Sequence, residues 1–115
     1  MTIYTIDDLF VNKDPLVREI YAALVNAISD WEGVRFTPKK TSIHIDWRTS
    51  FAGIHPRKKY INLNIRTAAA IDSIRVIKQE QVSQNRFHNL ICVNTVSDVD
   101  DELIGWLRDG YMLSQ

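Results

Sequence analysis

The sequence lacks the features that mark secreted, membrane-spanning and metal-binding proteins. Its 115 residues include one cysteine, Cys92, which alone cannot build a disulfide framework. The N-terminus has no basic start followed by a long apolar run, and no stretch reaches the length of a transmembrane helix. The histidines and acids do not show the close spacing of zinc motifs. We therefore expect a cytoplasmic protein with no metal, no cofactor and no membrane partner.

Catalytic signatures are equally scarce. Ser42, His44 and Asp46 alternate along one apparent strand and contain the residue types of a hydrolase triad. Residues two apart on a strand lie about 6.5 to 7 Å apart with parallel side chains, which does not bring a nucleophile to its base. No nucleophile elbow or oxyanion loop accompanies them. The pattern is typical of a solvated sheet face, so we predict no catalytic residues and favour a binding role over an enzymatic one.

Few residues interrupt regular structure, since the chain has only four glycines and three prolines. No linker, internal repeat or low-complexity segment divides it. The contents of 45% hydrophobic and 24% charged residues are those of a globular domain. A chain of this size buries roughly two thirds of its unfolded surface, which is enough for a single core. We predict one α+β domain spanning residues 1–115.

Two amphipathic helices are predicted, one near each end of the chain. The first begins at Asp14 as N-cap with Pro15 in the first helical position, and we expect it to end at Gly33. The second begins at Ser97, which with Asp100 forms a predicted capping box. The inward-facing residues of the first recur at three- and four-residue spacing: Val17, Ile20, Tyr21, Leu24, Ile28 and Trp31. We expect both apolar stripes to pack against one core.

The middle of the chain changes to the two-residue period of strands. In TSIHIDW, Ile43, Ile45 and Trp47 share one face, and the polar residues between them share the other. Residues 51–55 and 59–65 form a predicted hairpin that reverses over His55 to Lys58.

Two later segments complete the predicted sheet. Residues 66–80 read as a loop or short helix followed by an edge strand, and RFHNLICVN is a further strand. The predicted fold is therefore α+β, with an antiparallel sheet of about four to six strands packed on one face by an N-terminal and a C-terminal helix.

Charge is strongly segregated although the total is zero. Residues 35–59 contain seven basic residues against Asp46 alone, a net charge of +6, whereas residues 1–34 and 97–115 each carry −4. Such a chain can attract an anion to its middle without being a generally basic protein.

The basic residues suggest a ligand-binding surface. If Lys39 and Lys40 open one strand while Arg57, Lys58 and Lys59 tip the next hairpin, both groups lie at one end of the sheet. Such a rim favours an anionic ligand or nucleic acid, whose phosphates position the protein. The predicted ligand-binding residues are Lys39, Lys40, Arg48, His55, Arg57, Lys58 and Lys59.

The same charge pattern is compatible with two roles that involve no anionic ligand. Lysines at hairpin tips also maintain solubility and discourage edge pairing. Alternatively, the domain is a protein–protein interaction module or homodimer, in which edge strands pair or the acidic helix start of one copy docks on the basic middle of another.

Several segments together resemble a known family. The stretches DPLVREIYAAL, FAGIHPRKKYINLNI and SDVDDELIGWLRDGY resemble the domain of unknown function 5655 family of small bacterial proteins. The resemblance covers nearly the whole chain. This family has no established reaction, and similar domains occur alone or attached to larger proteins, some nuclease-related. The resemblance therefore implies an accessory or binding domain and assigns no catalytic residues.

Overall fold

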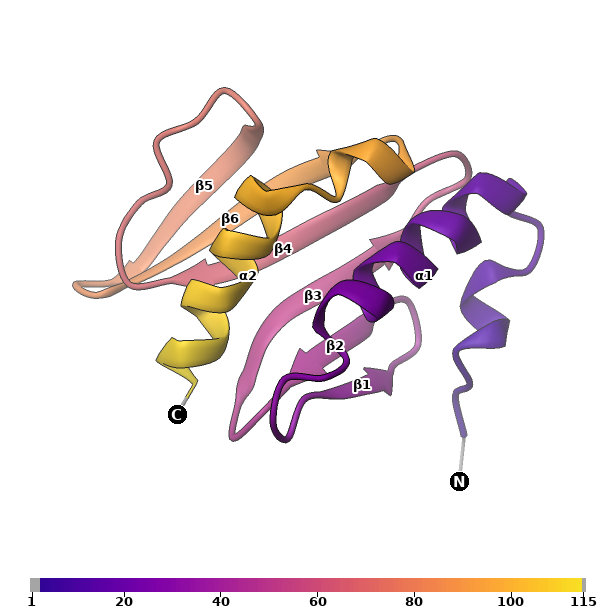
Figure 1. The fold of residues 1–115 in the computed structure, drawn as a ribbon, viewed down its shortest axis with the longest axis horizontal. Coiled ribbons are helices and arrows are strands. Elements are labelled where there is room, and N and C mark those ends of the chain that lie inside the picture. Colours follow the sequence, from indigo (N-terminus) through magenta and orange to yellow (C-terminus); the bar gives the residue numbers. More distant parts are fainter. Residues whose placement is uncertain (1–2, 115) are drawn as a thin grey trace.

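The computed structural model describes residues 3–114 and confirms the α+β class (Figure 1). All neighbouring strands are antiparallel, and they form one six-stranded sheet in the order β1-β2-β3-β4-β6-β5. The elements in chain order are η1 (Asp7–Phe10), α1 (Pro15–Ile28), β1 (Arg35–Pro38), β2 (Ile43–Asp46), β3 (Ser50–Pro56), β4 (Ile61–Thr67), β5 (Val76–Ser83), β6 (Arg86–Val93), η2 (Val96–Asp98) and α2 (Asp101–Leu113).

Helix α1 begins as predicted and ends earlier than predicted. The Asp14 carboxylate accepts a hydrogen bond from the Leu16 N–H at 2.9 Å, and Pro15 occupies the first helical position. The helix ends at Ile28, and Gly33 lies in the loop that follows. Gly33 has a φ of +74°, and a Cβ there would lie 2.6 Å from the Trp47 indole. Gly33 is therefore needed for the loop that leads into β1, and it does not terminate the helix.

Helix α2 is preceded by an additional helical turn, which shifts its cap. Thr95 and Asp98 form the capping box of η2, and the Asp98 carboxylate accepts hydrogen bonds from the N–H groups of Asn94 and Thr95. Asp100 then caps α2 by accepting from the Leu103 N–H at 3.0 Å. The predicted cap at Ser97 is wrong, because two overlapping caps occupy the residues on either side of it.

The predicted alternation of the sheet is confirmed. The side chains of Ile43, Ile45, Ile61, Leu63 and Ile65 are all completely buried beneath the helices. The hairpin turn lies later than predicted, because β3 continues through His55 and Pro56 and the Arg57 N–H donates to the Tyr60 carbonyl at 2.8 Å. His55 is therefore a strand residue paired with Asn62.

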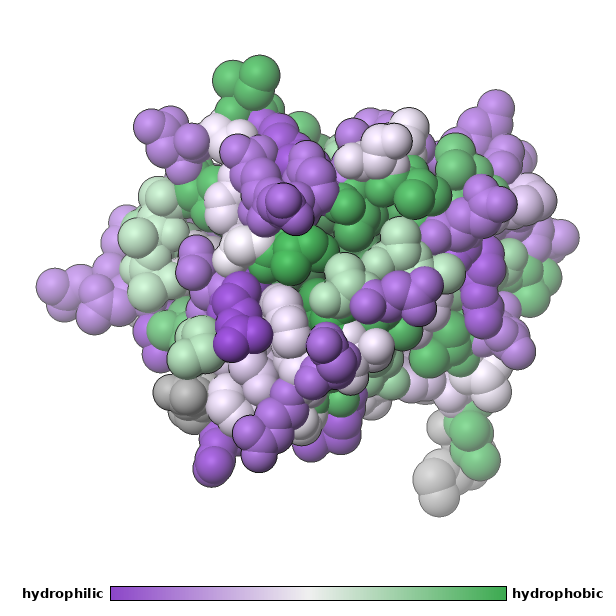
Figure 2. All heavy atoms as spheres, viewed as in Figure 1, coloured by the Kyte–Doolittle hydropathy of each residue, from purple (hydrophilic) through white to green (hydrophobic). Residues whose placement is uncertain are grey.

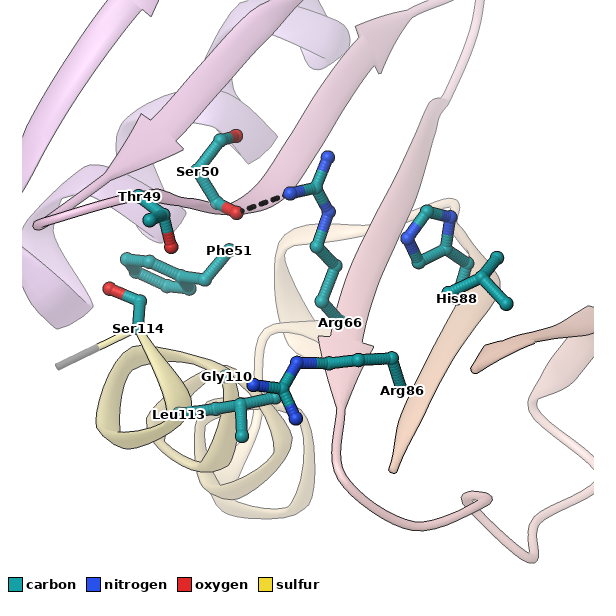
Figure 3. Close-up of a pocket in the computed structure, with 10 residues that line it drawn as sticks. Thr49, Ser50, Phe51, Arg66, Arg86, His88, Gly110, Leu113 and Ser114 are labelled. Carbon is teal, nitrogen blue, oxygen red and sulfur yellow. Dashed lines mark hydrogen bonds between the residues drawn. The ribbon is translucent and has the colours of Figure 1, made fainter. Parts of the chain in front are cut away.

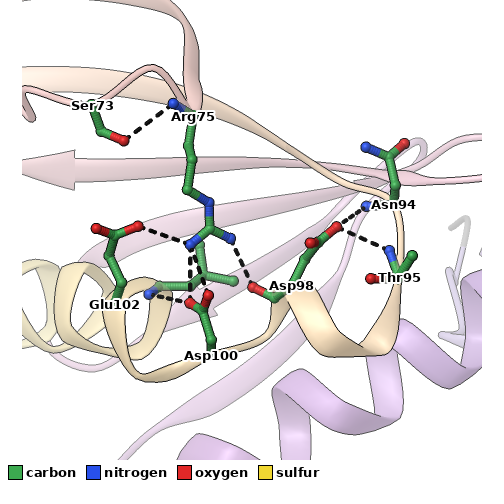
Figure 4. Close-up of polar contacts among 8 residues, drawn as sticks. Ser73, Arg75, Asn94, Thr95, Asp98, Asp100 and Glu102 are labelled. Atoms are coloured by element: carbon green, nitrogen blue, oxygen red, sulfur yellow. Dashed lines mark hydrogen bonds and ion pairs between the residues drawn. The ribbon is translucent and has the colours of Figure 1, made fainter.

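Residues 66–85 continue β4, cross a loop and form the edge strand β5. The loop is held to α2 by Arg75, as Figure 4 shows. The Arg75 guanidinium forms ion pairs with Asp100 and Glu102, each at 3.0 Å, and donates to the Asp98 carbonyl at 2.8 Å. The predicted edge strand is confirmed, and the segment before it is a loop rather than a short helix.

Both long helices cover the same face of the sheet and leave the other face uncovered. Figure 2 views the helix side and shows apolar residues along the strip between α1 and α2. Tyr111 joins the helix side to the sheet. Its ring stacks on that of Trp47 with 4.3 Å between the ring centres, and its hydroxyl donates to the Glu32 carbonyl at 2.6 Å. We call the uncovered side the open face. Among the described residues, no helix is long and apolar enough to cross a bilayer.

Candidate functional site

The β1–β2 turn and the β3–β4 turn lie at the same end of the sheet. The strand order requires this, because β1, β2, β3 and β4 are successive antiparallel neighbours (Figure 1). Strand spacing separates the two turns by about 10 Å across the sheet. The first turn carries Lys39 and Lys40 and the second carries Arg57, Lys58 and Lys59, all exposed. We call these five residues the cationic rim.

Within the part of the chain that the structure describes, no ion pair neutralises the charges of the cationic rim. Among residues 3–114, the salt bridges involve only Arg18 and Arg75. The start of α1 abuts the second turn, because the Asp14 N–H donates to the Lys58 carbonyl at 2.8 Å. This contact fixes the backbone of the turn while its side chains stay in solvent. A fixed backbone with free cationic side chains is suited to contacting phosphates.

Arg48 and His55 complete the predicted ligand residues, and they lie in different places relative to the cationic rim. Arg48 is in the β2–β3 turn at the opposite end of the sheet, where its guanidinium lies 5.9 Å from the centre of the Trp47 ring. His55 is on β3, with its side chain on the open face next to the rim. The structure therefore brings His55 near the five rim residues and does not bring Arg48 there.

The open face has a shallow hollow at its centre. Gly53 pairs with His44 on one side and Asn64 on the other, and its missing side chain leaves a cavity of about 110 Å³. All three histidines of the chain, His44, His55 and His88, line this cavity. The described residues nevertheless contain no group of three or more His, Cys, Asp or Glu side chains placed to hold a metal ion. The hollow is a polar surface with hydrogen-bonding capacity.

His55 is less basic than an ordinary histidine. Partial burial is the main cause of its lowered pKa, and the positive charge of Arg57 and the neighbouring His44 lower that pKa further. At neutral pH, His55 therefore contributes a neutral imidazole that can donate or accept a hydrogen bond. Next to it, the Asn62 Oδ1 atom is buried without a hydrogen-bond partner among the described residues.

A larger cavity, of about 360 Å³, lies at the end of the sheet opposite the cationic rim. Figure 3 shows Arg66, Arg86 and His88 on its strand side and the last turn of α2 across from them. Arg66 and His88 also line the central hollow, so the two cavities are neighbours that share part of their walls.

Comparison with protein families assigns the chain to one of them. The model of the family described as Domain of unknown function (DUF5655) matches residues 6–114. The chain belongs to this family. Comparison with curated proteins and with solved structures finds no match for this DUF5655 domain. The function of the domain must therefore be argued from its own residues.

Sequence reasoning missed the residues of the DUF5655 domain that gather at the larger cavity. Arg66 and Arg86 are 20 positions apart in the sequence, and they come together because β4 pairs directly with β6. Gly110 also lines this cavity, and a Cβ there would lie 2.8 Å from the Arg66 carbonyl. The only available signal was the alternation of β4, which assigns Arg66 to the same face as Asn62 and Asn64.

Proposed function

We propose that this DUF5655 domain binds nucleic acid, or a similar polyanion, through the phosphates. The observation that supports the proposal is the cationic rim, in which five exposed cations share one end of the sheet without ion pairs among residues 3–114. Lys39 and Lys40 occupy one turn, and Arg57, Lys58 and Lys59 occupy the other. The rim lies at the border of the open face, where His55, Asn62 and Asn64 offer neutral hydrogen-bonding groups.

The proposed recognition is of the backbone rather than of base sequence. Proteins that read single strands stack bases on aromatic side chains, and Tyr60, 36% exposed, is the aromatic residue of the rim turns. No tryptophan or phenylalanine is among the large exposed hydrophobic residues of the described chain. Lysine and arginine contacts to phosphates give affinity without sequence information and depend strongly on salt.

The test is the binding of a fluorescently labelled single-stranded oligonucleotide, measured by anisotropy over a range of salt concentrations. If all five rim residues contact phosphates, the logarithm of the binding constant falls against the logarithm of salt concentration with a slope of about −3.5. The Lys58→Glu/Lys59→Glu variant should lose binding because it replaces attraction with repulsion.

Arg48 provides a matched control, because it is an exposed cation at the other end of the sheet. Arg48→Glu changes the net charge as much as Lys58→Glu does. We expect Lys58→Glu to weaken binding markedly and Arg48→Glu to have little effect. Equal losses in the two variants would mean that net charge, and not the cationic rim, determines binding. Absence of binding at low salt would refute the proposal outright.

A second candidate function, homodimerisation, is supported by the edge strand β5. Its outer side has no neighbouring strand among the described residues, and Ile77 and Val82 are 60% and 47% exposed. If two copies of β5 pair antiparallel about Gln79, Lys78 of each copy lies opposite Glu80 of the other. Opposite charges in such cross-strand positions favour pairing.

A charge swap tests this candidate by light scattering. Wild type should be dimeric, Lys78→Glu monomeric, and Lys78→Glu/Glu80→Lys dimeric again, because the swap restores the cross-strand pairs. A monomeric wild type at high concentration would exclude homodimerisation.

For either function we propose a cytoplasmic location, which suits a chain whose one cysteine, Cys92, is a partly exposed free thiol.

A further inference from the structure

The larger cavity at the end of the sheet, which we call the end pocket, has the size of a small-molecule site. Its volume is about 360 Å³, and ligand pockets begin at about 300 Å³. The walls come from the β2–β3 turn, the adjoining ends of β3 to β6, and the last turn of α2 (Figure 3). Residues from several elements of the fold therefore meet at this cavity. The end pocket therefore suits a compact ligand better than a polymer.

The side chains lining the end pocket are positively charged or neutral. Arg66, Arg86 and His88 line it, and no aspartate or glutamate does. Neither arginine forms an ion pair within residues 3–114. Arg66 donates one hydrogen bond to the Ser50 carbonyl at 2.7 Å, and Arg86 donates one to the Asn85 carbonyl at 2.8 Å. Because a guanidinium has five N–H donors, both retain donors for an anion.

Ser114 supplies a polar group that lacks a partner. The residue is 5% exposed, it lines the end pocket, and its hydroxyl has no hydrogen-bond partner among the described residues. A buried hydroxyl without a partner is unfavourable, so a ligand oxygen that accepts from Ser114 would remove an existing cost.

Part of the remaining wall of the end pocket is apolar, and Thr49 and Ser50 complete the wall. Phe51 is almost completely buried beneath the pocket, and Val82 and Leu113 contribute aliphatic surface. Gly110 brings α2 close to β4, since its Cα lies where any side chain would contact the Arg66 carbonyl. Two guanidiniums without an ion pair among residues 3–114, beside aliphatic side chains, are complementary to a molecule that combines an oxyanion with an apolar body.

We propose that the end pocket binds a small organic anion. Arg66 and Arg86 hold its carboxylate or phosphate group, Ser114 donates a hydrogen bond to it, and its apolar body packs on Val82 and Leu113. Arginine forks match the paired oxygens of both head groups. This site is separate from the cationic rim, which lies at the other end of the sheet, and does not depend on the rim binding nucleic acid.

The test is a titration of the isotopically labelled full chain, followed by amide chemical shifts. Phenyl phosphate and benzoate are the two probes, because they share an apolar ring and differ in head group. Inorganic phosphate and benzyl alcohol test the head group and the ring separately. We expect saturable shifts at residues 49–51, 86–88 and 110–114, with at least one of the two probes binding more tightly than either fragment. The tighter probe identifies the head group.

Two arginine variants give a matched comparison. Arg86→Gln should weaken binding of the tighter probe by at least about tenfold, because a charge-assisted hydrogen bond to the oxyanion is lost. Arg48→Gln removes an exposed arginine at the same end of the sheet but outside the pocket, and should leave affinity unchanged. Both side chains are exposed, so both variants should fold, which their spectra verify.

Three results would overturn the proposal. The first is an absence of saturable shifts with both probes. The second is shifts confined to residues 39–40 and 57–59, which would assign the anion to the cationic rim. The third is an equal loss of affinity in Arg86→Gln and Arg48→Gln. If the end pocket binds its probe and the chain does not bind the oligonucleotide, only the proposed binding of nucleic acid by the cationic rim is refuted.

Discussion

The two faces of the sheet are built from the same strands and have opposite roles. On the helix-covered face, Ile43, Ile54 and Leu63 are completely buried, whereas their open-face neighbours His44, His55 and Asn64 remain partly in solvent. The covered face gives stability through apolar burial, and the open face has groups that can bind but little that must be buried. The alternation of strands thus separates the residues needed for folding from those available for function.

The largest expected effect on stability comes from comparing an alanine substitution on the covered face with one on the open face. Leu63→Ala should lower the free energy of unfolding by about 3 kcal/mol, because it leaves a cavity under the helices. Asn64→Ala, the next residue on the open face, should change it by no more than about 0.5 kcal/mol. Urea denaturation measures both. Similar losses would mean that the open face is packed against something and is not free.

A pair of glycines in α2 tests how closely the covered face is packed. A Cβ on Gly110 would lie 2.8 Å from the Arg66 carbonyl and 3.3 Å from Phe51, whereas a Cβ on Gly105 meets nothing within 4 Å. We expect Gly110→Ala to destabilise by about 2 kcal/mol through overpacking. Gly105→Ala should stabilise by about 0.5 to 1 kcal/mol through helix propensity. Thermal unfolding of the two variants gives the comparison, and destabilisation by both would contradict it.

Asp100 joins the loop before β5 to helix α2, and its contribution to stability should depend on pH. The Leu103 N–H and the Arg75 guanidinium lower the pKa of Asp100 below its ordinary value of 3.8. The carboxylate therefore stabilises the fold above about pH 3.8, and that contribution is lost as pH falls through the lower folded pKa. Asp100→Ala should cost about 1 kcal/mol at pH 7 through loss of the cap.

The acid dependence can be isolated with Asp100→Asn, which keeps a capping oxygen and removes the charge. Its unfolding free energy should fall less steeply with acid than that of wild type. Asp101→Asn makes the same charge change one residue later without touching the hydrogen bonds to Leu103 and Arg75. If the unfolding free energy of Asp100→Asn falls as steeply with acid as that of wild type, the Asp100 carboxylate is not the source of the acid dependence.

The smallest expected effect lies on the open face, at His55. Its folded pKa is below 6.5, so the unfolded chain binds more protons in the window between the folded pKa and 6.5. The stabilising contribution of neutral His55 should therefore be fully present above about pH 6.5 and should decline slightly as pH falls through this window. His55→Gln should flatten the decline, which urea denaturation at several pH values detects. An unchanged pH profile would show that His55 is as well solvated in the fold as in the unfolded chain.

Much of the fold could be predicted because local patterns agreed with the final packing. The period of two in β2 and β4 and the cap at Asp14 were sufficient to define strand faces and a helix start. Helix ends were harder to predict. The apolar stripe of α1 continues to Trp31, yet Trp31 packs on Tyr111 from the following loop, so a tertiary contact produced what resembled helical spacing.

The candidate sites were predictable only where sequence neighbours also became spatial neighbours. Arg57, Lys58 and Lys59 are adjacent in the chain and share one turn, and hairpin topology added Lys39 and Lys40. The end pocket depends instead on β4 pairing with β6 rather than with β5, together with the place where α2 ends. Neither is specified by local periodicity, which explains why Arg66, Arg86 and Ser114 escaped notice.

The stacking of Tyr111 on Trp47 bears on how the chain folds during synthesis. The hydroxyl of Tyr111 reaches the backbone of Glu32, 79 positions earlier, so this contact closes a loop over most of the chain. Helix α2 also covers strands that leave the ribosome before it does. A nascent chain halted before residue 111 would therefore expose the part of the apolar side that α2 covers, and chaperones could bind it in that interval.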